Sequence, residues 1–175
     1  MIIISLKKLK IIDIFLLMFI SFIAHNIYQY FPSILVSIFF PINESIFEHM
    51  KIIFTSLILT SIIDYIILKL NNISYNNFRF QTFMTSFISI PIFLTIYLPI
   101  HYLLGENIIV TLIILFITYI ISQVISYILL NHKEIPIINQ ISIPLIILVY
   151  FNFLVLTLIP NKDDFFYDTY TTKET

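Results

Sequence analysis

The densest group of residues that could do chemistry lies between Pro41 and Lys51, where the chain reads PINESIFEHMK. Helical spacing puts Glu44, Glu48 and Lys51 on one face, with His49 on an adjacent strip. Two acids, an imidazole and an ammonium within two turns could supply a general base, with Glu48 or His49 in that role. We therefore take four residues as candidate catalytic groups: Glu44, Glu48, His49 and Lys51.

Other ionisable residues are expected at the same depth. If Lys69 marks the inner membrane boundary, about 20 residues of helical rise place the outer boundary near Met50. The same counting puts His25, His101 and Glu106 in this outer layer. Ionisable residues at membrane depth usually face a cavity and one another, which favours a functional pocket. The alternative is an overlong helix whose capped end simply projects into water.

A metal site is one form that such a pocket could take. Imidazole and carboxylate groups are suitable ligands for zinc or manganese, and four candidates follow: His25, Glu48, His49 and His101. No His-Glu-x-x-His spacing supports this assignment, and no Gly-x-Ser-x-Gly motif marks a nucleophile. Hydrolysis of a lipid or its headgroup by an acid–base pair is an equal alternative.

Five apolar segments would have to position these residues. The chain is 59% hydrophobic and 11% charged, whereas soluble domains carry about 25% charged residues. Crossing about 30 Å of hydrocarbon takes about 20 apolar residues in a helix, because backbone groups in lipid must bond internally. The sequence predicts an all-α integral membrane bundle, a single domain over 1–175 with a polar tail at 160–175. Its five transmembrane helices are expected at 11–30, 43–70, 80–103, 107–130 and 138–159.

Capping and turn residues set the expected boundaries. Asn43 is predicted to be the N-cap of the second span, with Glu44 in its first turn. The apolar run 33–40 is too short to cross, which indicates an interfacial turn or a shallow re-entrant piece. The polar tail is either a solvated end or a lid over the outer layer.

The short loops predict the orientation of the chain in the cell membrane. Six Lys and Arg residues fall at the end that holds the N-terminus, and three fall at the other end. Positive residues accumulate in cytoplasmic loops, so the N-terminus is predicted inside and the C-terminus outside. The bilayer is the expected partner. A net charge of −1 gives no basic stripe for nucleic acid, and protein partners are not indicated.

Two acids lie toward the inner ends of their spans. Asp13 is expected to pair with the Lys7–Lys10 cluster at the interface. Asp64 is expected to pair with Lys69 or Arg79, or alternatively to belong to a proton or ion path. With one Gly in the chain, close helix packing must rely on Ser, Thr and Ala.

The 41–51 motif resembles that of a family of small bacterial multi-pass membrane proteins of unknown function, in which it reads Pro-Val-Asn-Glu-Ser-Val-Trp-Glu-His-Leu-Lys. The likeness extends to a histidine in the first span, to a Gln-x-x-Ser-Tyr in the fourth, and to a Pro, Phe and Asp in the tail. The matching positions are His25, Gln123, Ser126, Tyr127, Pro160, Phe166 and Asp168. The chain departs at Phe47, where the family has Trp, and at Thr171–Thr172, where it has Tyr-Gly. The resemblance implies no activity.

These observations predict an integral membrane protein with a polar outer-face site whose role stays open. An intramembrane hydrolase or transferase, with or without a divalent metal, is one alternative. A small transporter or a partner-binding subunit is another. A transporter would be expected to hold its site near the midplane in broken helices, whereas most of these charges lie off the midplane.

Overall fold

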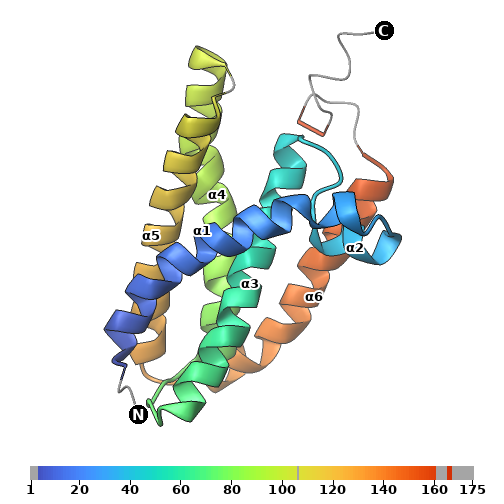
Figure 1. Ribbon diagram of the computed structural model, residues 1–175. Helices are drawn as coiled ribbons and strands as arrows, with labels where there is room; N and C mark the ends of the chain where they lie inside the picture. Colours follow the sequence, from blue (N-terminus) through green and yellow to red (C-terminus); the bar gives the residue numbers. More distant parts are fainter. Residues whose placement is uncertain (1–3, 106, 161–164, 167–175) are drawn as a thin grey trace, which may run out of the picture.

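A computed structural model describes residues 4–105, 107–160 and 165–166 of the chain. The described residues are all-helical apart from loops and turns, which confirms the predicted all-α class (Figure 1). The helices are α1 (Leu6–Tyr30), α2 (Ile34–Phe39), α3 (Ile46–Leu70), α4 (Phe78–Leu104), α5 (Ile108–Asn131) and α6 (Pro136–Leu158). All except α2 are long and apolar enough to cross a membrane.

The five long helices coincide with the five predicted spans, with ends that differ by a few residues. The largest difference is at the start of α1, which begins at Leu6 instead of residue 11. The Ser5 hydroxyl accepts a hydrogen bond from the Lys8 amide at 3.3 Å, so the helix starts within the polar segment. An apolar run marks where lipid begins, and it does not mark where a helix begins.

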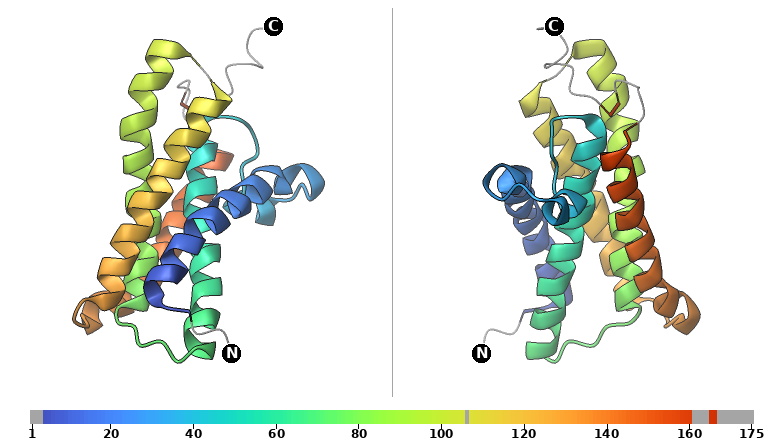
Figure 2. Two further views of the ribbon diagram at one scale, coloured as in Figure 1. Left: turned by 60° about the vertical axis from the view of Figure 1, so that its left-hand side comes forward. Right: turned by 90° about the vertical axis from the view of Figure 1, so that its right-hand side faces the viewer.

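The helix α3 is central and is the most buried of the long helices. It packs against α1 and α4, while α5 packs against α4 and α1, and α6 packs against α4. Figure 1 and the left view of Figure 2 show α1 crossing in front of α3 at a steep angle, which carries its C-terminal end to α2. The short helix α2 lies against α6. The outward faces are apolar, as in Phe15 and Phe22, which are 64% and 73% exposed.

Small hydroxyl residues lie at the helix crossings, as expected for a chain with a single Gly. The Ser21 hydroxyl on α1 donates to Ser56 on α3 at 3.0 Å and lies 2.5 Å from the Tyr119 hydroxyl on α5. The hydroxyls of Ser89 on α4 and Ser122 on α5 are also 2.5 Å apart. These contacts fix which positions of the four helices share a level in the bundle.

Candidate functional site

The segment before α3 turns sharply, and the turn separates Glu44 from the helix. The Asn43 side chain accepts a hydrogen bond from the Ser45 amide at 3.0 Å, which forms an Asx turn around Glu44. Ser45 caps α3, since its hydroxyl accepts from the Glu48 amide at 3.2 Å. The prediction that Asn43 is the N-cap is therefore wrong. Asn43 holds the turn, and Glu44 precedes the helix instead of lying in its first turn.

Three of the residues singled out in the sequence lie together where α1 passes the start of α3. The Glu44 carboxylate lies 3.3 Å from His25 Nε2 through one oxygen and 3.6 Å from His49 Nε2 through the other. The two imidazole rings are 5.7 Å apart between centroids. One ligand atom from each residue lies within 4.8 Å of the other two. Glu44 is 47% exposed, and the histidines are about one-third exposed.

The hydrogen bonding of His49 determines what its inner nitrogen presents to this group. His49 Nδ1 lies 2.9 Å from the Ser45 carbonyl oxygen. A carbonyl can only accept, so Nδ1 carries the proton, and Nε2 of the neutral ring has a lone pair. That lone pair faces a carboxylate oxygen, and a proton or a metal ion between these two acceptors would make the contact favourable. Metal-binding histidines usually donate their second N–H to such a carbonyl.

Glu48 and Lys51 form a separate network, buried between α3, α6 and the end of α2. Lys51 Nζ lies 2.5 Å from Glu48 Oε2 and donates to the Ser37 carbonyl at 2.8 Å and to the Thr157 hydroxyl at 2.9 Å. Those partners use all three ammonium protons. Glu48 Oε2 also accepts from the Ile42 amide at 2.8 Å, and Oε1 accepts from Thr157 at 3.2 Å. Every polar atom of the pair is therefore satisfied.

His101, another candidate of the predicted outer layer, does not join the three clustered residues. The His101 ring stacks on Tyr97, and its Nδ1 lies 3.2 Å from the Tyr97 hydroxyl. Glu106 lies outside the described residues. The structure thus brings together His25, Glu44 and His49, and it turns Glu48 and Lys51 toward each other.

Two described residues of the tail contact the start of α3. The Phe165 carbonyl accepts a hydrogen bond from the Phe47 amide at 3.1 Å, which satisfies an N–H in the first turn. The Phe166 ring lies 5.0 Å from the Phe47 ring between centroids. At Phe165–Phe166, the chain therefore folds back onto the helix that carries Glu48 and His49.

The two inner acids share one lysine. Lys10 Nζ lies 3.0 Å from Asp13 Oδ2 and also contacts Asp64 Oδ2. The expected pairing of Asp13 with the Lys7–Lys10 cluster is confirmed, and both partners are buried in the protein. The expectation that Asp64 pairs with Lys69 or Arg79 is wrong. The Lys69 ammonium instead lies 4.6 Å from the centroid of the Tyr65 ring.

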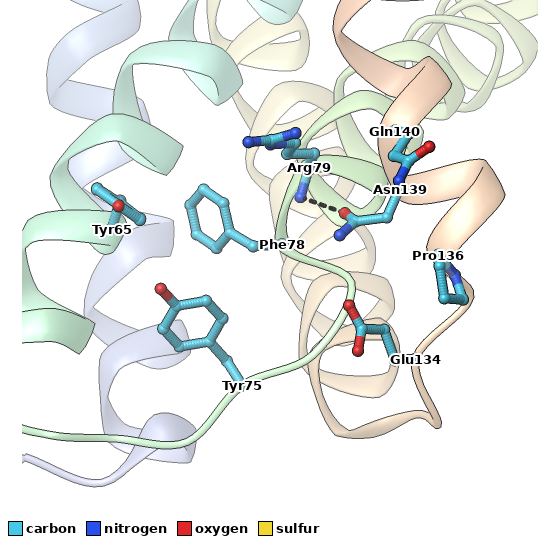
Figure 3. A pocket seen from close by; sticks show the side chains of 8 residues that line it. All are labelled: Tyr65, Tyr75, Phe78, Arg79, Glu134, Pro136, Asn139 and Gln140. Carbon is cyan, nitrogen blue, oxygen red and sulfur yellow. Dashed lines mark hydrogen bonds between the residues drawn. The ribbon is translucent and has the colours of Figure 1, made fainter.

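A pocket of about 360 Å³ lies at the end of the bundle where α1 begins, at the loops that join α3 to α4 and α5 to α6. Figure 3 shows Tyr65, Tyr75 and Phe78 on one side and Asn139 on the other. The Asn139 side chain accepts from the Arg79 amide at 3.0 Å and so caps the start of α4 from α6. Tyr65 is 16 residues along α3 from His49, about 24 Å at helical rise, so this pocket is distinct from the histidine group.

Sequence reasoning missed the residues that complete each network from distant segments. Thr157 and the Ser37 carbonyl hold Lys51, and Lys10 holds Asp64. Periodicity gives no signal for these partners, because it says which face a residue lies on but not which helix meets it. A lysine near a membrane-buried acid was the one available hint, and Lys10 was read only as a partner of Asp13.

Comparison with known proteins gives a family without an assigned activity. No curated protein and no solved structure matches the chain. A family profile matches residues 1–175, over the whole length of the sequence. The chain therefore belongs to a family of unknown function, DUF6512.

Proposed function

We propose that the protein is a multi-pass cell-membrane protein that binds one divalent transition metal, zinc or manganese, at its outer face. The proposed ligands are His25, Glu44 and His49, with Glu44 in place of Glu48 and His101 from the sequence-based set. The observation that carries the proposal is the convergence of their ligand atoms within 4.8 Å. Ligands of a tetrahedral zinc ion lie about 3.4 Å apart, and Glu44 approaches His25 at 3.3 Å through one oxygen and His49 at 3.6 Å through the other.

The electrostatics of the group support the same proposal. The Glu44 carboxylate faces two imidazole nitrogens, and the His49 hydrogen bond to Ser45 leaves a lone pair directed at it. A divalent ion between these atoms would replace acceptor–acceptor repulsion with three favourable bonds. Nitrogen and oxygen ligands together suit zinc and manganese better than calcium or magnesium, which prefer oxygen alone.

A catalytic role is the second candidate, and it rests on the number of protein ligands. Three ligands leave a fourth position free, and Glu44 is 47% exposed at that point. Catalytic zinc sites have this form, with a metal-bound water whose pKa is about 7. Such a water could add to an ester carbon or phosphorus of a lipid headgroup and release the alcohol. Glu48 and Lys51 would then brace the site without touching substrate.

The proposed orientation places the N-terminus in the cytoplasm and the metal group outside. It rests on the exposed cations that surround the N-terminal end of the bundle: Lys7, Lys8, Lys69, Arg79 and Lys133. Because the chain lacks cysteine, a single cysteine replacing the exposed Tyr102 tests this directly. A membrane-impermeant maleimide added to intact cells should label it. Labelling that occurs only after lysis would reverse the orientation.

Metal binding is tested by calorimetric titration of the detergent-purified, chelator-stripped protein with zinc and with manganese. One ion per chain should bind, and Glu44→Gln or His49→Ala should weaken binding by at least about tenfold, since each removes a ligand. His101→Ala is the matched control, because it removes an imidazole of the same outer layer and should bind as the wild type does. A wild type without saturable binding, or equal losses in His101→Ala and His49→Ala, would refute the proposed ligand set.

A further inference from the structure

The inner group of buried charges does not balance. Lys10, Asp13 and Asp64 are at most 4% exposed, and together two carboxylates and one ammonium carry a net charge of −1. The ammonium contacts the Oδ2 atom of each acid, whereas both Oδ1 atoms have no hydrogen-bond partner among the described residues. An uncompensated charge in a dry interior is costly, so this group requires one further positive charge.

Other buried oxygens in the bundle interior are also without partners in the described part of the chain. These atoms are Thr60 Oγ1, Gln81 Oε1, Gln123 Oε1 and Ser126 Oγ, on residues at most 4% exposed. Buried side-chain oxygens in native proteins are nearly always bonded to protein, water or an ion. Each of these four atoms therefore calls for a polar partner such as water or an ion.

The helix register places these oxygens at the level of the two acids. The Ser21 hydroxyl contacts both Ser56 and Tyr119, so these three residues mark one level of α1, α3 and α5. Moving eight residues inward along each helix leads from Ser21 to Asp13 and from Ser56 to Asp64. The Lys10 contacts with both acids confirm this register independently.

The same eight-residue step inward along α5 leads from Tyr119 to the residue after Ser126, so Ser126 lies close to the level of the two acids. Thr60 and Gln123 lie about one turn farther out. Ser89 on α4 contacts Ser122 on α5, so these two residues lie at the same level. Counting from this pair along α4 places Gln81 about one turn inward of the level of Ser126. All six unpartnered oxygens therefore fall within about three turns of the four helices α1, α3, α4 and α5.

We propose that this interior binds one small monovalent cation, with the Oδ1 atoms of Asp13 and Asp64 as its charged ligands. One positive charge neutralises the group. Among the described residues, every unpartnered buried side-chain N or O atom is an oxygen, the ligand of hard cations, and none is the nitrogen that zinc prefers. The cation is a sodium ion or a proton, as in membrane ion and proton pathways. The site shares no residue with the proposed metal group and does not depend on it.

Sodium binding is tested by thermal unfolding of the full-length protein in detergent, in sodium chloride and in choline chloride of equal ionic strength. At a hundredfold excess over Kd, sodium should raise the melting temperature by roughly 5–10 °C. Asp64→Asn should abolish the shift, because the remaining Asp13–Lys10 pair is already neutral. Glu134→Gln, which neutralises an exposed acid at the same end, should keep the shift.

The proton is tested by infrared spectroscopy of the same preparation. If the cation is a proton, the wild type at neutral pH should show the carbonyl stretch of a buried protonated carboxyl, and Asp13→Asn or Asp64→Asn should remove it. Either a sodium-specific shift or this band supports the site and identifies its occupant. A wild type that shows neither overturns the proposal, and this outcome needs no variant to fold.

Discussion

Glu44 and Glu48 lie one helical turn apart in sequence, and the structure places them in opposite environments. Glu48 is 2% exposed, and both of its oxygens accept hydrogen bonds or an ion pair. Glu44 is 47% exposed and faces two imidazole nitrogens. A buried carboxylate must have a complete set of partners, whereas a half-exposed one can remain unsatisfied until a ligand arrives. One short motif therefore contains both a buried ion pair that braces the helices, Glu48–Lys51 (the brace), and a candidate binding group, Glu44 (the open acid).

Ser45, which separates the two acids, produces this difference. As the N-cap, it starts α3 after Glu44 and before Glu48. Glu44 thus lies in the preceding turn and meets α1, while Glu48 lies in the first helical turn and meets Lys51 and α6. This difference between the braced Glu48 and the open Glu44 leads to three predictions, given in order of decreasing expected effect.

Lys51→Met should have the largest effect, because it leaves Glu48 charged and unpaired in the interior. Breaking a buried ion pair from one side costs about 3–5 kcal/mol, which here would fall on the free energy of unfolding. Equilibrium unfolding of the purified protein in mixed micelles measures this cost. Adding Glu48→Gln to Lys51→Met should restore part of the stability, since the buried charge is then removed.

Lys69→Met is the control for the loss of a lysine as such. Its ammonium is exposed and rests on Tyr65, so its removal should change the free energy of unfolding by less than about 0.5 kcal/mol. If Lys51→Met were as mild as this control, Glu48 would not depend on Lys51, and the contrast with Glu44 would be lost.

Metal binding at the open acid should depend on pH. His25 and His49 can bind a metal only when neutral, so protons compete with the ion for both imidazoles. Affinity should therefore fall as the pH is lowered, by up to about a hundredfold per unit, or ~2.7 kcal/mol, once both imidazoles are protonated. Zinc titrations at several pH values measure this slope. A flat profile would exclude both imidazoles as ligands.

Much of the fold could be predicted from the sequence, because lipid imposes a strong constraint on it. The five long helices follow from apolar runs that must satisfy their backbone internally, and Pro41 and Gly105 fall in the loops between them. For the short helix at 34–39, the sequence predicted only a segment too short to cross the membrane. Helix ends were less predictable, because a single hydroxyl such as that of Ser5 can extend a helix past its apolar segment.

The site could be predicted in part, as far as shared depth goes. Counting residues put His25 and His49 in one layer, and the structure places them side by side. Depth could not separate His101, whose ring stacks on Tyr97 of its own helix, α4. Nor could it tell Glu44 from Glu48, because that difference depends on which residue caps α3. The direction in which a side chain points, and the helix that it meets, are set by tertiary contacts that a single sequence does not encode locally.

Of the three predictions, the smallest effect is expected from Thr157→Val, which tests how many polar partners the Glu48–Lys51 pair needs. The valine keeps the shape of the side chain but removes a hydroxyl that accepts from Lys51 at 2.9 Å and donates to Glu48 at 3.2 Å. The ion pair itself survives, so the loss should be about 1–3 kcal/mol, the cost of leaving buried polar atoms without a partner. Thr157→Ser, which keeps the hydroxyl, should lose less in the same unfolding assay. Zinc affinity should be unchanged in both variants, because the brace and the open acid have no polar partner in common. If the valine variant lost metal affinity while remaining folded, α6 would position Glu44 through the brace. The two acids would then act as one coupled site.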